Sequence, residues 1–215
     1  KVAINHPLAK NIIGAFYQPD LVFIDPGTLI SLPSREFATG LAELIKHAFI
    51  ADPDFISWLE ENMDAIIARD VEILSHAIYR SCQIKAGVVE LDERETGLRM
   101  ILNYGHTIGH AIEAATGYSE YTHGEAVAMG MVYEAGIAEK MGLIKQDYIN
   151  RLADILERAG LPTQLDTPAW DLIIERMNHD KKNVDQRIVL VLPIGYGKVK
   201  IFKELTPEQL KQFLE

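Results

Sequence analysis

The chain has 215 residues, 48% of them hydrophobic and 24% charged, as in a globular protein with a sizeable core. Its formal net charge of −10 argues against non-specific binding to nucleic acid or to anionic membranes. No apolar run reaches the length of a membrane span. The single cysteine, Cys82, excludes an internal disulfide, which suits a reducing environment. We therefore expect a cytoplasmic protein whose partners are neither nucleic acid nor membrane.

The first 25 residues differ in character from the rest of the chain. Residues 1–20 carry Gly, Pro and Asn and are expected to form loops or short extended pieces. Residues 21–24, LVFI, indicate a buried strand, followed by a connecting loop. A lone strand is not stable by itself, and the chain opens without Met. We therefore expect a fragment that lacks an upstream partner.

Helical spacing of apolar residues dominates residues 34–177. Ser34 is the expected N-cap of the first helix, and Asp52 or Asp54 lies near the start of the second. The polar break LDERETGLR, residues 91–99, interrupts the series and contains Gly97. Beyond the first, helices are predicted at about residues 52–68, 70–90, 101–116, 124–141, 146–159 and 168–177.

The C-terminal section changes period. RIVLVLPIGYGKVKIF, residues 187–202, holds two β-branched runs around Pro193, Gly195 and Gly197, which is a hairpin signal. Thr206 as N-cap and Pro207 as first helical residue predict a closing helix. The whole pattern predicts a mainly α, multi-helical domain with a small β-hairpin and a strand-bearing N-terminal lead.

Three histidines stand out in this pattern. His106 and His110 are four residues apart and share a helix face. Their spacing leaves open whether they bind one metal or whether one of them only fills the core or caps a helix. Gly105 and Gly109 remove bulk beside them, which allows a ligand or another backbone to approach closely. His123 begins the following helix, so all three histidines can converge.

A catalytic divalent metal usually has three protein ligands, and Glu43, Glu113 and Glu125 are the acidic candidates for a mixed site. Glu113 lies two turns along the axis from His106, too far to share its metal. Glu125 is next but one to His123, so its side chain points elsewhere. Glu43 occupies an apolar helical stretch where a carboxylate needs a partner, and that partner is either a metal or Lys46, one turn on.

Several cations surround these residues in the sequence. Each of Lys1, Lys10, Lys85, Arg94, Arg99, Lys181 and Lys182 is individually best explained as a solvated surface residue. Together they can form a pocket for a substrate with phosphate and carboxylate groups. Asn103, one turn before His106, adds a hydrogen-bonding group to that predicted helix face. Because the chain contains no G-x-G-x-x-G motif, it holds no self-contained dinucleotide site.

Four stretches together resemble the 3-dehydroquinate synthase family: KVAINHPLAKNIIGAFYQP, LPSREFATGLAELIKHAFI, KAGVVELDERETGLRMILNYGHTIGHAIEA and THGEAVAMGM. The resemblance runs from Lys1 to about Gly142 and resumes at DKKN and the hairpin, although AKN stands where the family has GKN. It implies a Rossmann-like NAD domain followed by a helical metal- and substrate-binding domain. Residues 1–25 would then be the tail end of the first, with one residual strand, and residues 26–215 the second.

The resemblance also implies roles for individual residues. The metal, zinc or cobalt, would be held by Glu43, His106 and His123. His110 would then be a catalytic residue and not a ligand, and Lys46 and Arg99 would be catalytic as well. The residues implied to bind substrate are Lys1, Asn11, Lys85, Arg99, Asn103 and one of Lys181 and Lys182. Those implied to contact the cofactor NAD are Lys1, Lys10, Thr28, Leu29, Ile30 and Ser31.

The implied reaction converts a seven-carbon ketoacid phosphate, DAHP, to 3-dehydroquinate and phosphate, a step of the shikimate pathway to aromatic amino acids. It proceeds by NAD-dependent oxidation, phosphate elimination, reduction and aldol cyclisation, in a homodimer. Three alternatives stay open: another sugar-phosphate cyclase making an inosose or valiolone, an iron-type alcohol or glycerol dehydrogenase, and a non-catalytic metal-binding domain. We expect this chain to bind about one metal ion and to be inactive alone.

Overall fold

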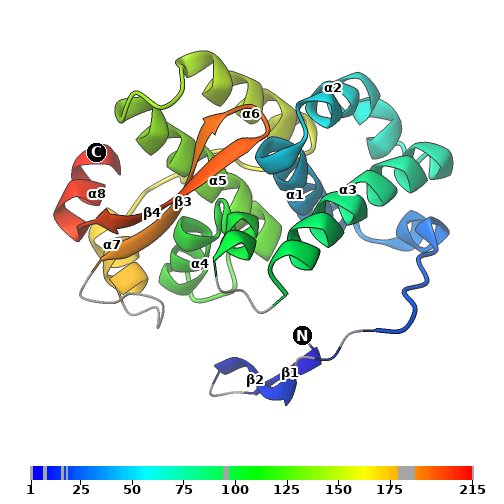
Figure 1. Ribbon diagram of the computed structural model, residues 1–215, viewed down its shortest axis with the longest axis horizontal. Coiled ribbons are helices and arrows are strands. Elements are labelled where there is room, and N and C mark those ends of the chain that lie inside the picture. The colour runs from blue at the N-terminus through cyan, green and yellow to red at the C-terminus, as the bar shows by residue number, and fades with distance from the viewer. Residues whose placement is uncertain are drawn as a thin grey trace.

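The computed structural model describes residues 2–6, 9–15, 17, 19–93, 97–178 and 187–214, and most of them are helical (Figure 1). The mainly α prediction is thus confirmed. The helices are α1 Ser34–Ala51, α2 Pro53–Ile67, α3 Val71–Leu91, α4 His106–Ala115, α5 His123–Lys140, α6 Gln146–Arg158, α7 Trp170–Asn178 and α8 Pro207–Leu214, with 3-10 helices η1 Pro26–Ser31 and η2 Leu98–Asn103.

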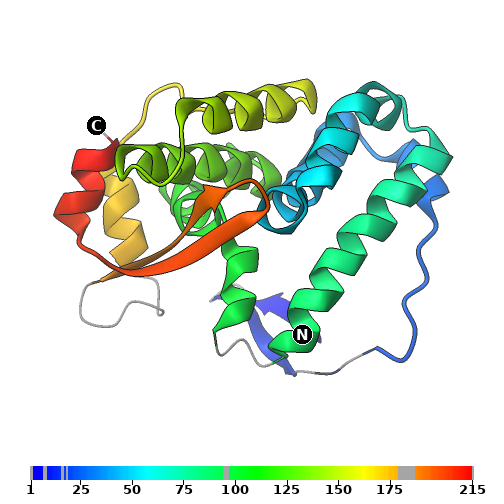
Figure 2. The same ribbon diagram turned by 45° about the horizontal axis from the view of Figure 1, so that its top comes forward.

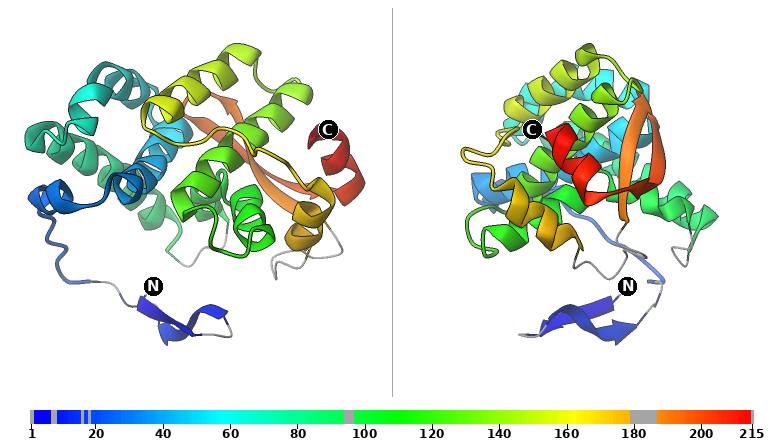
Figure 3. Two further views of the ribbon diagram at one scale, coloured as in Figure 1. Left: turned by 180° about the vertical axis from the view of Figure 1, so that it is seen from behind. Right: turned by 90° about the vertical axis from the view of Figure 1, so that its left-hand side faces the viewer.

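The N-terminal lead departs from the prediction. β1 (Val2–His6) and β2 (Ala9–Ala15) pair antiparallel where only loops or short extended pieces were expected. The predicted buried strand over residues 21–24 is wrong: these residues have no regular structure, and Phe23 is 86% exposed. No strand in the described part of the chain lies beside them to pair with. Figures 1 and 3 show β1–β2 set apart from the helical body.

Side-chain caps mark several of the predicted helix starts. Asp52 accepts a hydrogen bond of 3.0 Å from the backbone N–H of Phe55 at the start of α2. Asp70 caps α3 in the same way, and Thr206 exchanges hydrogen bonds with Gln209 at the start of α8. The prediction for Ser34 is wrong, because Ser34 is the first helical residue of α1 and Pro33 before it offers no side-chain cap.

The helix predicted over residues 101–116 is divided in two. η2 ends at Asn103, a turn follows, and α4 begins only at His106. The division falls at Gly105, whose φ of +78° is left-handed and interrupts a right-handed helix. Asn103 therefore belongs to η2, and the prediction that it shares a helix face with His106 is wrong.

The core consists of two clusters that share α5. Val127, Met131 and Ala135 face the cluster formed with α1, α2 and α6, whereas Met129 and Ile137 face the cluster formed with α4, α7 and the hairpin. α5 lies in the middle of the body (Figure 2) and buries side chains toward both clusters. This agrees with the rule that a helix which is apolar all round is a buried one. Even so, none of the described helices combines the length and the apolarity needed to cross a membrane.

The predicted C-terminal hairpin is confirmed. β3 (Ile188–Gly195) and β4 (Lys198–Leu205) pair antiparallel through a turn at Tyr196 and Gly197. β3 packs against α5, and the hairpin lies along one side of the helices (Figure 3). Thr107 donates a hydrogen bond of 2.9 Å to the carbonyl of Val189, which ties the first turn of α4 to this hairpin.

Candidate metal and substrate site

The backbones of α4 and α5 are in close contact near the histidines. A Cβ atom on Gly105 would lie 2.5 Å from Cγ of Met131 and 2.7 Å from the carbonyl oxygen of Val127. A Cβ atom on Gly109 would lie 3.0 Å from the carbonyl oxygen of Ala126. Of the two uses expected for these glycines, the structure shows the approach of another backbone. The first turn of α4, with His106, is thereby fixed against α5.

A buried carboxylate from α5 caps α4. Glu134 is 0% exposed, and its Oε2 accepts a hydrogen bond of 2.7 Å from the backbone N–H of Gly105. A glycine has no side chain with which to cap its own helix, and Glu134 supplies the missing acceptor. Burial raises the pKa of Glu134 well above its usual value, although backbone N–H groups at the start of α4 oppose the rise.

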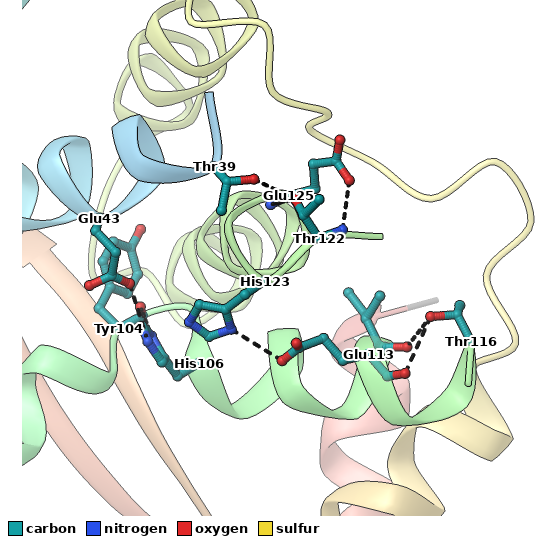
Figure 4. A network of polar contacts seen from close by, with 10 residues as sticks. Thr39, Glu43, Tyr104, His106, Glu113, Thr116, Thr122, His123 and Glu125 are labelled. Atoms are coloured by element: carbon teal, nitrogen blue, oxygen red, sulfur yellow. Dashed lines mark hydrogen bonds and ion pairs between the residues drawn. The ribbon is translucent and has the colours of Figure 1, made fainter. Parts of the chain in front are cut away.

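A second close contact brings α1 to the site. A Cβ atom on Gly124 would lie 2.3 Å from the carbonyl oxygen of Thr39. The hydroxyls of Thr39 and Thr122 are hydrogen-bonded at 2.7 Å, and Thr122 caps α5 in a reciprocal pair with Glu125. As expected, Glu125 points away from the histidines, toward Arg35. Glu43, one turn after Thr39, consequently lies across from His106 (Figure 4).

The three histidines converge, as the sequence predicted. The ring centroid of His106 lies 5.3 Å from that of His110 and 5.2 Å from that of His123, and the ring centroids of His110 and His123 are 5.6 Å apart. One nitrogen atom from each ring lies within 4.8 Å of the others. Ligand atoms on one tetrahedral zinc ion are about 3.3 Å apart, so binding one ion would draw these nitrogen atoms closer together.

Hydrogen bonds fix which nitrogen atoms face the cluster. Nδ1 of His106 lies 3.1 Å from the carbonyl oxygen of Tyr104, which only accepts, so Nδ1 carries the proton. Nδ1 of His123 lies 3.2 Å from Oε2 of Glu113. Both histidines are thus held by Nδ1, and Nε2 is left for a metal, which is the arrangement typical of metal-binding histidines.

Glu43 joins the histidines to a buried cation. Its Oε2 lies 2.7 Å from Nζ of Lys46, whose side chain is only 3% exposed, so the ion pair considered for these residues is present. Its Oε1 is buried without a hydrogen bond, 3.3 Å from Nε2 of His106. Burial opposes ionisation of Glu43, but His106 and Lys46 outweigh it and lower the pKa of the carboxyl. An unsatisfied carboxylate oxygen facing an imidazole nitrogen suits a divalent cation between them.

The other predicted substrate residues are placed unevenly. Lys85 is exposed on α3, and its charge lowers the pKa of Lys46, although burial is the larger cause. Arg99 is half-buried in η2 and donates a hydrogen bond of 2.8 Å to the carbonyl of Glu93. Asn103 is half-buried. Lys1, Arg94, Lys181 and Lys182 lie outside the described residues, as do the side chains of Lys10 and Asn11.

The predicted NAD segment, Thr28–Ser31, lies in η1. The hydroxyl of Thr28 donates to the carbonyl of Asp25, and that of Ser31 donates to the carbonyl of Thr28. These bonds are local and hold the turn. Leu29 packs against the first core cluster, whereas Ile30 is 58% exposed.

Two carboxylates, Glu113 and Glu134, make contacts at the site that the sequence did not predict. Glu113 was rejected as a ligand because of its distance along α4 from His106, yet it contacts His123 from α5. The signal was available: Glu113 follows Ile112 and precedes Ala114, and a carboxylate in an apolar helix needs a partner. That argument was applied to Glu43 alone.

Comparison with known proteins decides the family. Residues 40–183 match the family described as 3-dehydroquinate synthase C-terminal, and residues 1–39 match the family described as 3-dehydroquinate synthase N-terminal. The chain belongs to the 3-dehydroquinate synthase family. The two matched regions meet after residue 39, and the domain boundary expected after residue 25 stays a prediction.

Curated 3-dehydroquinate synthases are similar over the whole chain. The protein from Thermodesulfovibrio yellowstonii is 49% identical over 218 residues, which cover 100% of this chain and 60% of that protein. The protein from Shewanella piezotolerans is 46% identical over 216 residues, with the same coverage. The chain therefore spans about three fifths of the length of these 3-dehydroquinate synthases.

Solved structures of related cyclases share the fold. A 2-epi-5-epi-valiolone synthase from Streptomyces hygroscopicus, with NAD+ and Zn2+ bound, is 25% identical with a TM-score of 0.87, covering 99% of this chain and 59% of that one. A 2-deoxy-scyllo-inosose synthase complexed with carbaglucose-6-phosphate, NAD+ and Co2+ is 29% identical with a TM-score of 0.83, covering 98% and 61%. The predicted dehydroquinate synthase-like fold is confirmed.

Proposed function

We propose that this chain is the metal- and substrate-binding part of a 3-dehydroquinate synthase, which converts DAHP to 3-dehydroquinate and phosphate in aromatic amino-acid biosynthesis. The observation that carries the proposal is the convergence of Glu43, His106, His110 and His123 beside the buried Lys46, in a chain 49% identical to a named 3-dehydroquinate synthase. The proposal includes a cytoplasmic location and a homodimer.

We assign the metal, zinc or cobalt, to Glu43, His106 and His123. In support, Oε1 of Glu43 lacks a hydrogen bond and lies 3.3 Å from Nε2 of His106, while His123 is held through Nδ1. A divalent ion there would act as a Lewis acid toward substrate oxygens. The proposed NAD, when bound, would accept a hydride from the substrate and return it.

His110 is assigned to proton transfer. It follows His106 by one turn of α4, is exposed, and its ring lies 5.3 Å from that of His106. An exposed imidazole beside the ligands is placed to take a proton from a substrate hydroxyl on a ring nitrogen and to return it. The alternative, His110 as a third histidine ligand, agrees with the grouping of the three rings and predicts loss of metal when His110 is removed.

The cations are assigned to the anionic groups of the substrate. Lys46 is a buried ammonium held by Glu43, so it is already dehydrated and oriented before a substrate arrives. Arg99 donates one of its five side-chain N–H groups to the carbonyl of Glu93. The remaining N–H groups can hold a carboxylate together with Lys85. Lys1, Asn11, Asn103 and one of Lys181 and Lys182 complete the proposed substrate set.

The proposed NAD contacts are Lys1, Lys10 and residues Thr28–Ser31. They amount to one edge of a dinucleotide site, because the chain contains no glycine-rich phosphate-binding motif. We therefore expect the chain alone to release no phosphate from DAHP. The missing part is expected from a longer protein of the length of the curated relatives.

A chimera tests the proposal. In it, this chain replaces the matching stretch of the 3-dehydroquinate synthase from Thermodesulfovibrio yellowstonii, and phosphate release from DAHP is measured with and without NAD and a metal chelator. We expect release that needs both NAD and metal and that His110→Ala and Lys46→Met each reduce strongly. A folded chimera that binds metal but leaves DAHP intact would refute the assignment.

The second candidate is another sugar-phosphate cyclase, which the shared fold with the valiolone and inosose synthases favours. Identities of 25% and 29% to these two, against 49% to a 3-dehydroquinate synthase, argue for DAHP. Glucose 6-phosphate, whose carbocyclic analogue binds the inosose synthase, lacks the carboxylate that Lys85 and Arg99 are proposed to hold. Phosphate release from glucose 6-phosphate but not from DAHP would favour the second candidate.

A further inference from the structure

We propose that Glu113 is a positioning residue: its carboxylate accepts the Nδ1 proton of His123 and so aims the Nε2 lone pair of that histidine at the metal. This inference rests on the proposed function, in which His123 is a ligand. It concerns a residue on the opposite side of the imidazole from the metal, at the third turn of α4.

The contact itself is clear in the structure. Oε2 of Glu113 lies 3.2 Å from Nδ1 of His123, and the two side chains point toward each other from α4 and α5 (Figure 4). The side chain of Glu113 is 6% exposed. A carboxylate so far from water needs hydrogen-bond donors, and an ionised carboxylate only accepts. With Glu113 ionised, the proton between the two groups belongs on Nδ1 of His123.

His123 needs such a partner more than His106 does. The side chain of His123 is 41% exposed, whereas that of His106 is 13% exposed. A half-exposed imidazole on the first residue of a helix is free to change rotamer and tautomer. His106 is held by the carbonyl of Tyr104, at 3.1 Å from Nδ1. Glu113 performs for His123 the task that a backbone carbonyl performs for His106.

The charge of Glu113 adds a second effect. A carboxylate that accepts from the outer nitrogen of an imidazole makes the inner nitrogen a stronger base and a better metal ligand. Glu113 itself is not among the residues whose ligand atoms cluster in the described part of the chain, which are His106, His110 and His123. Its role is thus to orient and strengthen a ligand, and it does not bind the ion.

The test measures metal binding by the chain, in wild type, Glu113→Gln and Glu113→Ala. Competition with a chromogenic chelator gives the dissociation constant for Zn2+, and the visible absorption of bound Co2+ reports the ligand geometry. We expect Glu113→Ala to weaken binding by roughly 10- to 100-fold and to shift the Co2+ bands. Glu113→Gln keeps an oxygen acceptor for Nδ1–H, so it should retain the wild-type bands and lose less affinity.

Glu125→Ala is the matched control. Glu125 is two residues after His123 and stabilises the same helix start through Thr122 and Arg35, but the structure shows it bonded to those groups and not to the imidazole. We expect a lower melting temperature with unchanged Zn2+ affinity. If Glu125→Ala and Glu113→Ala weaken Zn2+ binding in proportion to their loss of stability, local unfolding is the cause and the inference fails.

His123→Ala separates this inference from the proposed function. If His123→Ala binds Zn2+ like wild type, the ligand assignment is wrong, whatever Glu113 does. If His123→Ala loses the metal while Glu113→Ala keeps both wild-type affinity and wild-type Co2+ bands, the ligand assignment stands and Glu113 has no positioning role.

Discussion

His47 should make the stability of the chain sensitive to mild acid. It follows Lys46 in α1, is 5% exposed, and its Nδ1 lies 2.7 Å from the hydroxyl oxygen of Ser81 on α3. Burial, assisted by the positive charge of Lys46, lowers the pKa of His47 from its ordinary value of 6.5 to about 4. Between pH 6.5 and about pH 4 the folded chain therefore keeps this imidazole neutral, whereas in the unfolded chain it is protonated below its ordinary pKa of 6.5.

The sign and size of the effect follow from linkage. Because the unfolded state binds the proton more tightly, the stability that His47 contributes is present above its ordinary pKa and is lost as the pH falls from 6.5 toward 4. A shift of that size corresponds to a loss of about 2.5 kcal/mol between about pH 7.5 and about pH 4.5. Most carboxyl groups titrate below this window. Glu134, whose pKa is raised, gives the opposite pH dependence within it, so the contribution of His47 is measured as the difference between wild type and a variant that lacks the imidazole.

Urea unfolding at the two pH values measures the loss. In His47→Asn the side-chain amide can still hydrogen-bond to the hydroxyl of Ser81, and no imidazole remains to be protonated. We expect lower stability at both pH values, because the smaller side chain leaves a cavity, but a fall between them that is smaller by about 2 kcal/mol. Ser81→Ala removes the hydrogen bond and keeps the buried imidazole, so the pH dependence should persist. An equal fall in wild type and His47→Asn would refute the reasoning.

Two further predictions concern the contact between α4 and α5, and urea unfolding tests both. Gly130→Ala should lower the free energy of unfolding by more than about 2 kcal/mol, because the new Cβ would lie 2.0 Å from the carbonyl oxygen of Gly105. Gly136→Ala on the same helix, where a Cβ would meet nothing within 4 Å, should raise it by up to about 1 kcal/mol. Similar effects of the two variants would show that the contact is loose. Glu134→Ala should cost about 2–4 kcal/mol, because it leaves the Gly105 N–H without its acceptor and opens a cavity. The raised pKa of Glu134 makes the neutral Glu134→Gln a close substitute, so a cost equal to that of the alanine variant would contradict the assigned capping role.

Local rules predicted the parts of the fold that depend on neighbouring residues. Thr206 caps its helix as expected, and of the two candidates Asp52 and Asp54 it is Asp52 that caps α2, because a cap is satisfied by backbone groups two or three positions away. The start of α4 could not be found in this way. The apolar spacing continues through residues 101–105, and the helix is interrupted by the left-handed Gly105, whose fit depends on α5.

The candidate site shows the same division. The ion pair of Glu43 with Lys46 follows from their spacing on one helix. The contact of Glu43 with His106 joins α1 to α4, and the spacing of residues within one helix cannot predict it. Only the resemblance to a family placed these two residues together. The contact of Glu113 with His123 was not predicted for the same reason, since distance along α4 says nothing about a residue on α5.

The metal content of the chain tests the central claim most directly. Wild type, His110→Ala and His123→Ala are loaded with Zn2+, dialysed, and analysed for zinc per chain, with circular dichroism to confirm that each is folded. We expect about one zinc ion in wild type and in His110→Ala, and far less in His123→Ala. A folded His123→Ala chain that keeps its zinc, or a folded His110→Ala chain that loses it, would contradict the assignment of Glu43, His106 and His123 as the ligands.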